Sequence, residues 1–191
     1  MSKGRLEAFS DAVIAIAITI MVLELRAPEG GSWAAVRPLV PALLTYALSF
    51  LFLGIYWNNH HHLLHAAERV NGKILWANMH LLFWLSLFPF VTGWLGENRG
   101  AVWPTVLYGA VLLMAGLAYF VLERVIVQQH DSHSTVARAI GRDAKGWASV
   151  ALYAAAIALA FAAEWAAQLV FLGVALLWLV PDRRIEAVLR S

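Results

Sequence analysis

The sequence contains no cysteine and little charge. Without cysteine the chain can form no disulfide, no thiolate zinc site and no cysteine-ligated cluster. Charged residues make up 14% of the 191 residues, against about 25% in an ordinary soluble domain. The formal net charge at pH 7 is only +2. This charge balance excludes the strongly basic footprint of a nucleic-acid-binding protein.

Hydrophobic residues, by contrast, make up 61% of the chain. A soluble domain contains roughly 45–50% apolar residues, and one water-soluble core of this size has no room for the excess. The composition therefore excludes a soluble enzyme and a disordered chain. It predicts an all-α membrane protein surrounded by the lipid bilayer.

Long apolar stretches separate the clustered charges. A bilayer core of about 30 Å needs roughly 20 apolar residues in a helix. The stretch Trp147–Val180 would be about 51 Å long as one helix, at about 1.5 Å per residue, so we divide it at a turn near Glu164 and Trp165. The sequence predicts one domain, 1–191, with six transmembrane helices at about residues 6–26, 38–65, 74–95, 102–124, 147–163 and 166–181.

Basic residues gather on one side of the predicted membrane. With six spans both termini lie on the same side, and eleven Lys and Arg residues lie with them. The opposite side has only three, Arg26, Arg37 and Arg99. Cytoplasmic loops of membrane proteins carry the excess of Lys and Arg. We therefore expect a multi-pass cell-membrane protein with both termini in the cytoplasm.

Two acidic residues lie near the cytoplasmic end of the first predicted helix. Glu7 and Asp11 are four residues apart, so they share one face and repel each other. Asp11 lies deep enough for desolvation to be costly unless a cation or hydrogen-bond donors are close. Arg5 and a histidine from another helix are the candidate partners. The alternative interpretation is an acidic residue stabilised by the dipole at the start of the helix.

Farther along the same helix, Thr19 is the lone polar side chain of the mid-membrane stretch. Ile16, Thr19 and Leu23 are spaced by three and four residues, so they form one stripe. The alternative interpretation is a threonine bonded to its own helix backbone, with Ile16 and Leu23 in ordinary packing.

Histidines are concentrated in the string WNNHHHLLH, and a further one ends the string WANMH. Membrane di-iron oxidases use histidine boxes, so a metal-dependent membrane oxidoreductase is an alternative function. The remaining histidines repeat no such box, and no carboxylate-rich set completes a coordination sphere, so we favour no metal. We expect a polar layer in which His61, His62 and His80 join helices by hydrogen bonds and pair with Asp11.

The segment RLEAFSD, Arg5–Asp11, fits the pattern R-x-x-x-F-S-D at the cytoplasmic end of the first span. Together with IAITIMVLEL and the later WNNHHH, it resembles the prokaryotic branch of the transmembrane protein 175 family of cation channels. The similarity extends over essentially the whole chain, because six spans are the unit of that family. The sequence departs from the pattern at Ala12, where glycine often follows the motif.

The resemblance implies a homotetramer in which the first helix of each six-helix subunit lines a central pore. The family passes potassium in preference to sodium, with some leak of other monovalent cations, and lacks a T-V-G-Y-G filter, which is absent here too. By position, Ile16 would match the hydrophobic constriction, Thr19 the threonine layer linked to selectivity, and Leu23 a further apolar ring.

The resemblance also implies that Arg5, Phe9, Ser10 and Asp11 form a buried motif that holds the first helix to its neighbours. It implies no catalytic residue and no cofactor; the partners are permeant K⁺, lipid and further copies of the chain, in a prokaryotic inner or plasma membrane. A small secondary transporter is an alternative, although Pro89 is the only candidate break well inside a span and no repeat is evident. An accessory subunit without transport is another.

Overall fold

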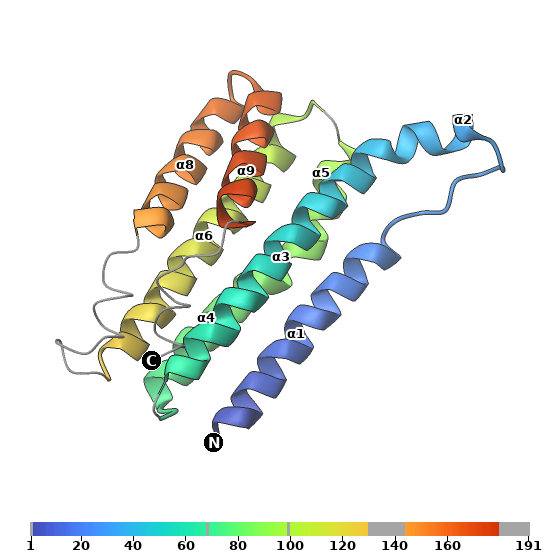
Figure 1. Cartoon of the computed structure of the whole chain (residues 1–191). Coiled ribbons are helices and arrows are strands. Elements are labelled where there is room, and N and C mark those ends of the chain that lie inside the picture. The colour runs from blue at the N-terminus through green and yellow to red at the C-terminus, as the bar shows by residue number, and fades with distance from the viewer. Residues whose placement is uncertain (1, 68, 99, 130–143, 180–191) are drawn as a thin grey trace.

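The computed structural model of the chain is a bundle of helices (Figure 1). It describes residues 2–67, 69–98, 100–129 and 144–179. The helices are α1 (Lys3–Leu23), α2 (Trp33–Val36), the 3-10 helix η1 (Arg37–Leu39), α3 (Val40–Ala66), α4 (Gly72–Ser86), α5 (Phe88–Glu97), α6 (Val102–Val127), α8 (Ala144–Ala160) and α9 (Glu164–Leu179).

Four helical stretches in the described part are long and apolar enough to cross a membrane. They are Lys3–Leu23, Trp33–Ala66, Gly72–Glu97 and Val102–Val127. The second stretch joins α2, η1 and α3, and it begins before the predicted start at residue 38. Two shorter apolar helices, α8 and α9, follow. The described part of the chain is therefore all-helical, and four of its helical stretches have lengths that suit a bilayer.

The third predicted span, 74–95, contains a break. α4 ends at Ser86, and α5 begins at Phe88 after the single residue Leu87. Pro89 lies in the first turn of α5, where its missing N–H removes one hydrogen bond to the preceding turn. The stretch therefore continues as two helical segments, at the position that the sequence identifies as a candidate break.

The long C-terminal apolar stretch forms two helices. α8 ends at Ala160 and α9 begins at Glu164, next to the turn expected from the sequence. The predicted last span, 166–181, extends beyond α9, so residues 180–181 lie outside the described residues. Six basic residues of the charge count also lie outside them, namely Arg99, Arg138, Arg142, Arg183, Arg184 and Arg190.

The α8–α9 pair packs closely against the rest of the bundle through α6. A Cβ atom at Gly109 would lie 2.8 Å from Phe171 Cζ and 2.9 Å from Ile157 Cγ1. Glycine at this position therefore permits the close approach of three helices, as small residues do in membrane bundles.

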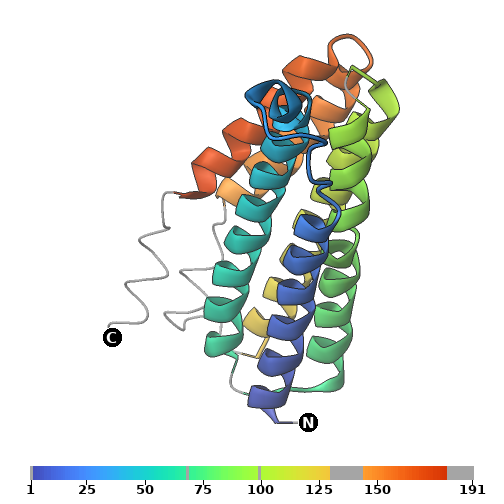
Figure 2. The ribbon, with the colours of Figure 1, turned by 90° about the vertical axis from the view of Figure 1, so that its right-hand side faces the viewer.

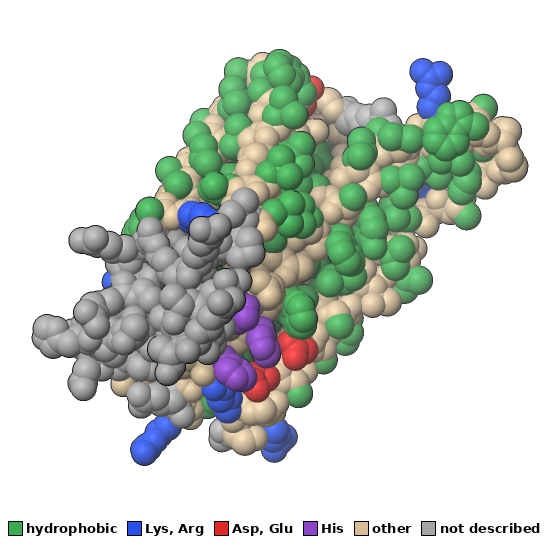
Figure 3. All heavy atoms as spheres, viewed as in Figure 1, with side chains coloured by type: hydrophobic (Ala, Val, Ile, Leu, Met, Phe, Trp, Pro, Cys, Tyr) green, Lys and Arg blue, Asp and Glu red, His purple; other side chains and the backbone are tan. Residues whose placement is uncertain are grey.

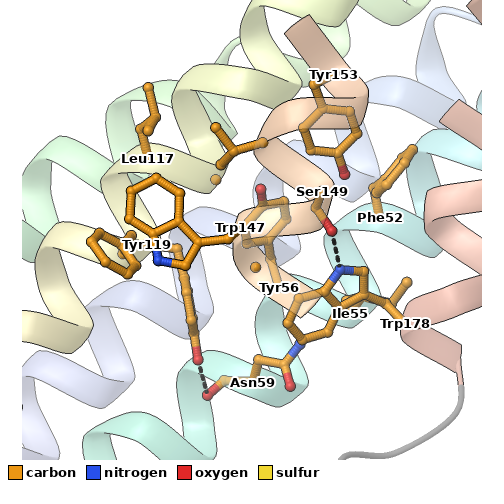
Figure 4. A pocket seen from close by; sticks show the side chains of 14 residues that line it. Phe52, Ile55, Tyr56, Asn59, Leu117, Tyr119, Trp147, Ser149, Tyr153 and Trp178 are labelled. Atoms are coloured by element: carbon orange, nitrogen blue, oxygen red, sulfur yellow. Dashed lines mark hydrogen bonds between the residues drawn. The ribbon is translucent and has the colours of Figure 1, made fainter. Parts of the chain in front are cut away.

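A small pocket lies between α3, α6, α8 and α9 (Figure 4). Its volume is about 60 Å³, and its lining is mostly apolar. At its edges Trp178 Nε1 donates to Ser149 Oγ at 2.9 Å, and the Tyr119 hydroxyl donates to the carbonyl of Asn59 at 3.2 Å. These hydrogen bonds join α9 to α8 and α6 to α3 at a distance from α1.

The first helix lies at an edge of the bundle (Figures 1 and 2). It contacts α3, α4 and α5 through residues that recur every three or four positions, namely Leu6, Ser10, Ile14, Ala17 and Met21. Its side away from these helices is open. α1 begins and ends about three residues before the predicted span of 6–26.

Candidate functional site

The two faces of α1 differ sharply in burial. Ile14 is 1% exposed on the packed face, whereas Ile16 is 57% and Leu23 is 77% exposed. Thr19 is also exposed. The structure therefore brings all three residues of the predicted stripe to the open face of α1, turned away from their own subunit.

The hydroxyl of Thr19 is bonded to its own helix. Thr19 Oγ1 donates to the carbonyl of Ala15 at 2.8 Å, as the alternative interpretation of this residue expects. A hydroxyl has one hydrogen and two acceptor lone pairs. Because the hydrogen is directed to the backbone, the oxygen remains an acceptor on the open face. This arrangement suits contact with a cation or with its water.

A buried polar network joins α1 to α3 and α4. Ser10 Oγ donates to the carbonyl of Leu6 at 2.9 Å and accepts from Asn78 Nδ2 at 2.9 Å. The other side of the amide, Asn78 Oδ1, lies 2.6 Å from His60 Nε2. Since an amide oxygen only accepts, His60 donates from Nε2. Ser10, Asn78 and His60 are all fully buried, so the network fixes the position of α1 against its neighbours.

This network contains a histidine that the sequence did not single out. It is built on His60, whereas His61, His62 and His80 were the residues expected to join helices. His61 is exposed, and its ring centroid lies 5.6 Å from that of His62. His80 is also exposed and accepts from Trp84 Nε1 at 3.0 Å. The residues inside the string are adjacent, and only the packing of α3 decides which one faces inward.

The single chain buries the expected motif only in part. Of its four residues only Ser10 is buried, whereas Arg5, Phe9 and Asp11 are exposed. Asp11 Oδ1 accepts from Trp57 Nε1 at 3.0 Å, a partner that was not expected. Histidine and acidic side chains gather on this end of the surface (Figure 3). The motif therefore anchors α1 through Ser10 and through the Asp11–Trp57 contact.

A second hydrogen-bonded layer lies nearer the opposite end of α1. Thr92 Oγ1 donates to Ser49 Oγ at 2.7 Å, and Ser49 Oγ lies 3.0 Å from the Tyr108 hydroxyl. The Thr92 hydroxyl also lies 3.6 Å from Met21 Sδ on the packed face of α1. This layer joins α3, α5 and α6. Single hydroxyl groups in apolar helices give no sequence signal of such a layer.

We find no candidate metal site in the described ranges of the chain. Among these residues no three His, Cys, Asp or Glu side chains gather in a way that could hold a metal ion.

Comparison with known proteins identifies relatives of this chain. The family model described as "Endosomal/lysosomal potassium channel TMEM175" matches residues 5–89. The chain is 50% identical over 191 residues to a potassium channel of Chryseobacterium sp. (strain P1-3), and the alignment covers 100% of both chains. It is 35% identical over 125 residues to a potassium channel of Streptomyces collinus, covering 61% of each.

A solved structure has the same fold. The crystal structure of a lysosomal potassium-selective channel TMEM175 homolog from Chamaesiphon minutus matches with a TM-score of 0.80 and 26% sequence identity. The match covers 93% of this chain and 96% of that chain. These relatives are named as channels and not as enzymes. Since half of its residues are identical to those of one such channel along the full length, the chain belongs to the TMEM175 family.

Proposed function

We propose that the chain is one subunit of a homotetrameric potassium channel whose pore is lined by the open face of α1. The observation that carries this proposal is the exposure of Asp11 and Thr19 on α1, whose other residues from Ala12 to Leu23 are all apolar. Ionisable and polar side chains are unfavourable against lipid, and in membrane proteins they face the bundle interior or water. A central aqueous path between four copies of α1 provides that surrounding.

Rotational symmetry would turn each residue of the open face into a ring of four. A ring of Ile16 side chains is an apolar neck that can lose its water and close. Leu23, exposed on the same face, would form a further apolar ring. A modest outward movement or rotation of α1 would then widen the neck and let water and ions pass.

Selectivity would arise without a filter of backbone carbonyls. Potassium holds its hydration water less tightly than sodium, so a narrow and weakly polar passage penalises potassium less. The Thr19 oxygen, whose hydrogen is directed to Ala15, would replace part of the lost water. A passage of this kind discriminates only in part, so we expect some leak of other monovalent cations. No cofactor is required for this function.

The relatives support the same conclusion. The Chryseobacterium protein is named a potassium channel, and this chain aligns with it over its full length. We propose that the chain acts in a prokaryotic cell membrane as one six-span domain, 1–191, with both termini in the cytoplasm. In this role the Ser10–Asn78–His60 network would hold α1 in register, so that its open face stays directed at the pore.

Flux through reconstituted protein tests the proposal. Liposomes that contain the purified chain and a potassium gradient should release K⁺ much faster than protein-free liposomes, and a sodium gradient should discharge more slowly. The mass of the detergent-solubilised particle, measured in parallel, should be that of four subunits. A tetramer that conducts neither ion, or a monomer that conducts, would refute the proposal.

A further inference from the structure

An arm, residues 27–39, projects from the bundle at the end opposite the N-terminus. It contains α2 and η1, and it extends beyond α1 on the side of the open face (Figures 1 and 2). Trp33 is 75% exposed, and Arg37 is exposed as well. The N–H of Arg37 donates to the carbonyl of Trp33, so the two side chains lie one helical turn apart. The arm thus presents an aromatic ring and a cation on one face.

A cleft opens at the same end of the molecule. It lies between the end of α1 with the residues that follow it, the start of α3, and α5 from Phe90 to Glu97. Its volume is about 560 Å³, within the range of about 300–1,000 Å³ that is usual for binding pockets. Phe90 and Trp94, stacked with ring centroids 6.2 Å apart, contribute to its lining. Two carboxylates, Glu24 and Glu97, lie there too, beside Arg26.

The carboxylates of Glu24 and Glu97 repel each other across the cleft. Partial burial and the neighbouring Glu97 carboxylate raise the pKa of Glu24 above its usual value. Both causes disfavour the charged form of Glu24, and a further cation close to the pair would favour it. Stacked aromatic rings also attract cations and pack well against an indole ring. The chemistry of the cleft therefore complements the chemistry of the arm.

The arm contributes Leu39 to the wall of the cleft, but its Trp33 cannot enter the cleft of the same chain. Trp33 and the cleft residue Leu43 belong to one continuous helical stretch, Trp33–Ala66. Ten residues of helix separate them by about 15 Å at about 1.5 Å per residue. The arm is also directed away from the bundle, past α1 (Figure 1). An occupant of the cleft must therefore come from outside the subunit.

We propose that the arm of a neighbouring copy of this chain occupies the cleft, with Trp33 against the aromatic pair and Arg37 facing Glu24 and Glu97. The inference rests on the proposed assembly around α1, because that assembly places a second subunit on the side to which the arm projects. A head-to-tail contact of this kind repeats from subunit to subunit and closes in a ring. Four such contacts, each between an arm and the cleft of the next subunit, would then hold the subunits together at the end of the pore opposite the N-terminus.

Cysteine cross-linking tests the contact, and the natural absence of cysteine makes the background clean. The double variant Trp33→Cys with Leu43→Cys should form, on oxidation in the membrane, a ladder of covalent dimers, trimers and tetramers on a denaturing gel. A disulfide requires Cα atoms within about 7 Å, so the pair cannot close inside one subunit. Trp33→Cys alone should give dimers at most.

The control places the second cysteine elsewhere at the same end. Trp103, at the start of α6, is 66% exposed but does not line the cleft. The pair Trp33→Cys with Trp103→Cys should therefore give no ladder. An arm that lies instead in the lipid interface would leave the Trp33–Leu43 pair monomeric and would overturn the inference.

Charge reversal tests the ionic half of the contact. In the cross-linking background, Arg37→Glu should lower the yield of linked subunits by about two- to fivefold, the effect of a partly exposed ion pair. Adding Glu97→Arg should restore the yield, because the two charges are exchanged. A yield that is unchanged by Arg37→Glu, or not restored by the exchange, would contradict the proposed pairing.

A separate cysteine distinguishes failure of the inference from failure of the assembly. Ile16→Cys, on the open face of α1 and outside the cleft, should be linked between subunits by a short bifunctional maleimide. If Ile16→Cys is linked while the Trp33–Leu43 pair is not, the arm contact is wrong and the assembly stands. If neither is linked and the particle has the mass of a monomer, the proposed function fails and the inference fails with it.

Discussion

At the scale of single residues, the attachment of α1 depends on one buried amide. Asn78 donates to Ser10 and accepts from His60, so it satisfies two polar groups that have no access to water. A buried donor or acceptor left without a partner costs about 1–3 kcal/mol. The amide therefore contributes more by satisfying its two neighbours than through the energy of either hydrogen bond.

Replacing this amide should weaken the fold. Asn78→Leu keeps the volume but leaves the His60 Nε2–H without an acceptor, so we expect a loss of about 1–3 kcal/mol in the free energy of unfolding. Thermal unfolding of the detergent-solubilised protein measures it. His80→Ala, which removes only an exposed hydrogen bond with Trp84, should stay within about 0.5 kcal/mol of the wild type. Equal stability of the two variants would show that the network does not anchor α1.

The sequence predicts the open face of α1 but not its buried partners. Ile16, Thr19 and Leu23 are spaced by three and four residues, so this stripe can be predicted from spacing alone. α3 is apolar on all sides for most of its length, and such a helix gives no signal of its orientation. The choice of His60 over His61 depends on packing against α4, which spacing does not reveal.

At the scale of elements, the bundle depends on close contact between α6 and the α8–α9 pair. Gly109 lies where α6 meets Phe171 of α9 and Ile157 of α8, and a Cβ atom would come within 3.0 Å of both. Atoms at this distance overlap, so one of the three helices must move to make room.

A pair of glycine substitutions tests this contact. Gly109→Ala should lower the free energy of unfolding by about 1–3 kcal/mol, the usual effect of overpacking, as measured by thermal unfolding in detergent. Gly54→Ala is the matched control in α3, because its Cβ would meet no atom within 4 Å. It should leave the stability unchanged or raise it slightly. Similar losses for both variants would mean that helix packing at Gly109 is not the cause.

Element boundaries could be predicted only where the backbone chemistry is distinctive. Pro89 marks the break between α4 and α5, because it cannot donate a backbone hydrogen bond. The helical arm ahead of α3 was not predicted: the segment from Arg26 to Pro38 contains glycine, proline and charge, which favour a loop. Its short helix forms as an extension of α3 rather than from a pattern of its own.

At the scale of the whole molecule, α1 is the element that the subunit leaves half covered. One face packs on α3, α4 and α5, and the other presents Ile16, Thr19 and Leu23 to the outside. The proposed tetramer rests on the family resemblance and not on a residue pattern of the chain. The central claim of the proposed pore is therefore that the ions pass along the face of α1 that carries Ile16, Thr19 and Leu23.

Substitution of Ile16 is the most direct test of that claim. Ile16→Asn would place four amides in the proposed neck, so water and ions should enter it more easily. A barrier lower by about 1.4 kcal/mol raises flux about tenfold, and we expect an increase of this order with weaker discrimination against sodium. Ile18 is the control: it is partly buried and packs against the core, so Ile18→Asn should destabilise the protein without opening the path.

The measurement is potassium and sodium flux from liposomes that contain either variant, compared with the wild type at equal amounts of assembled protein. We expect higher flux and lower potassium selectivity for Ile16→Asn alone. If Ile16→Asn forms an intact tetramer and keeps both the flux and the selectivity of the wild type, Ile16 does not line the neck and the open face of α1 is not the pore.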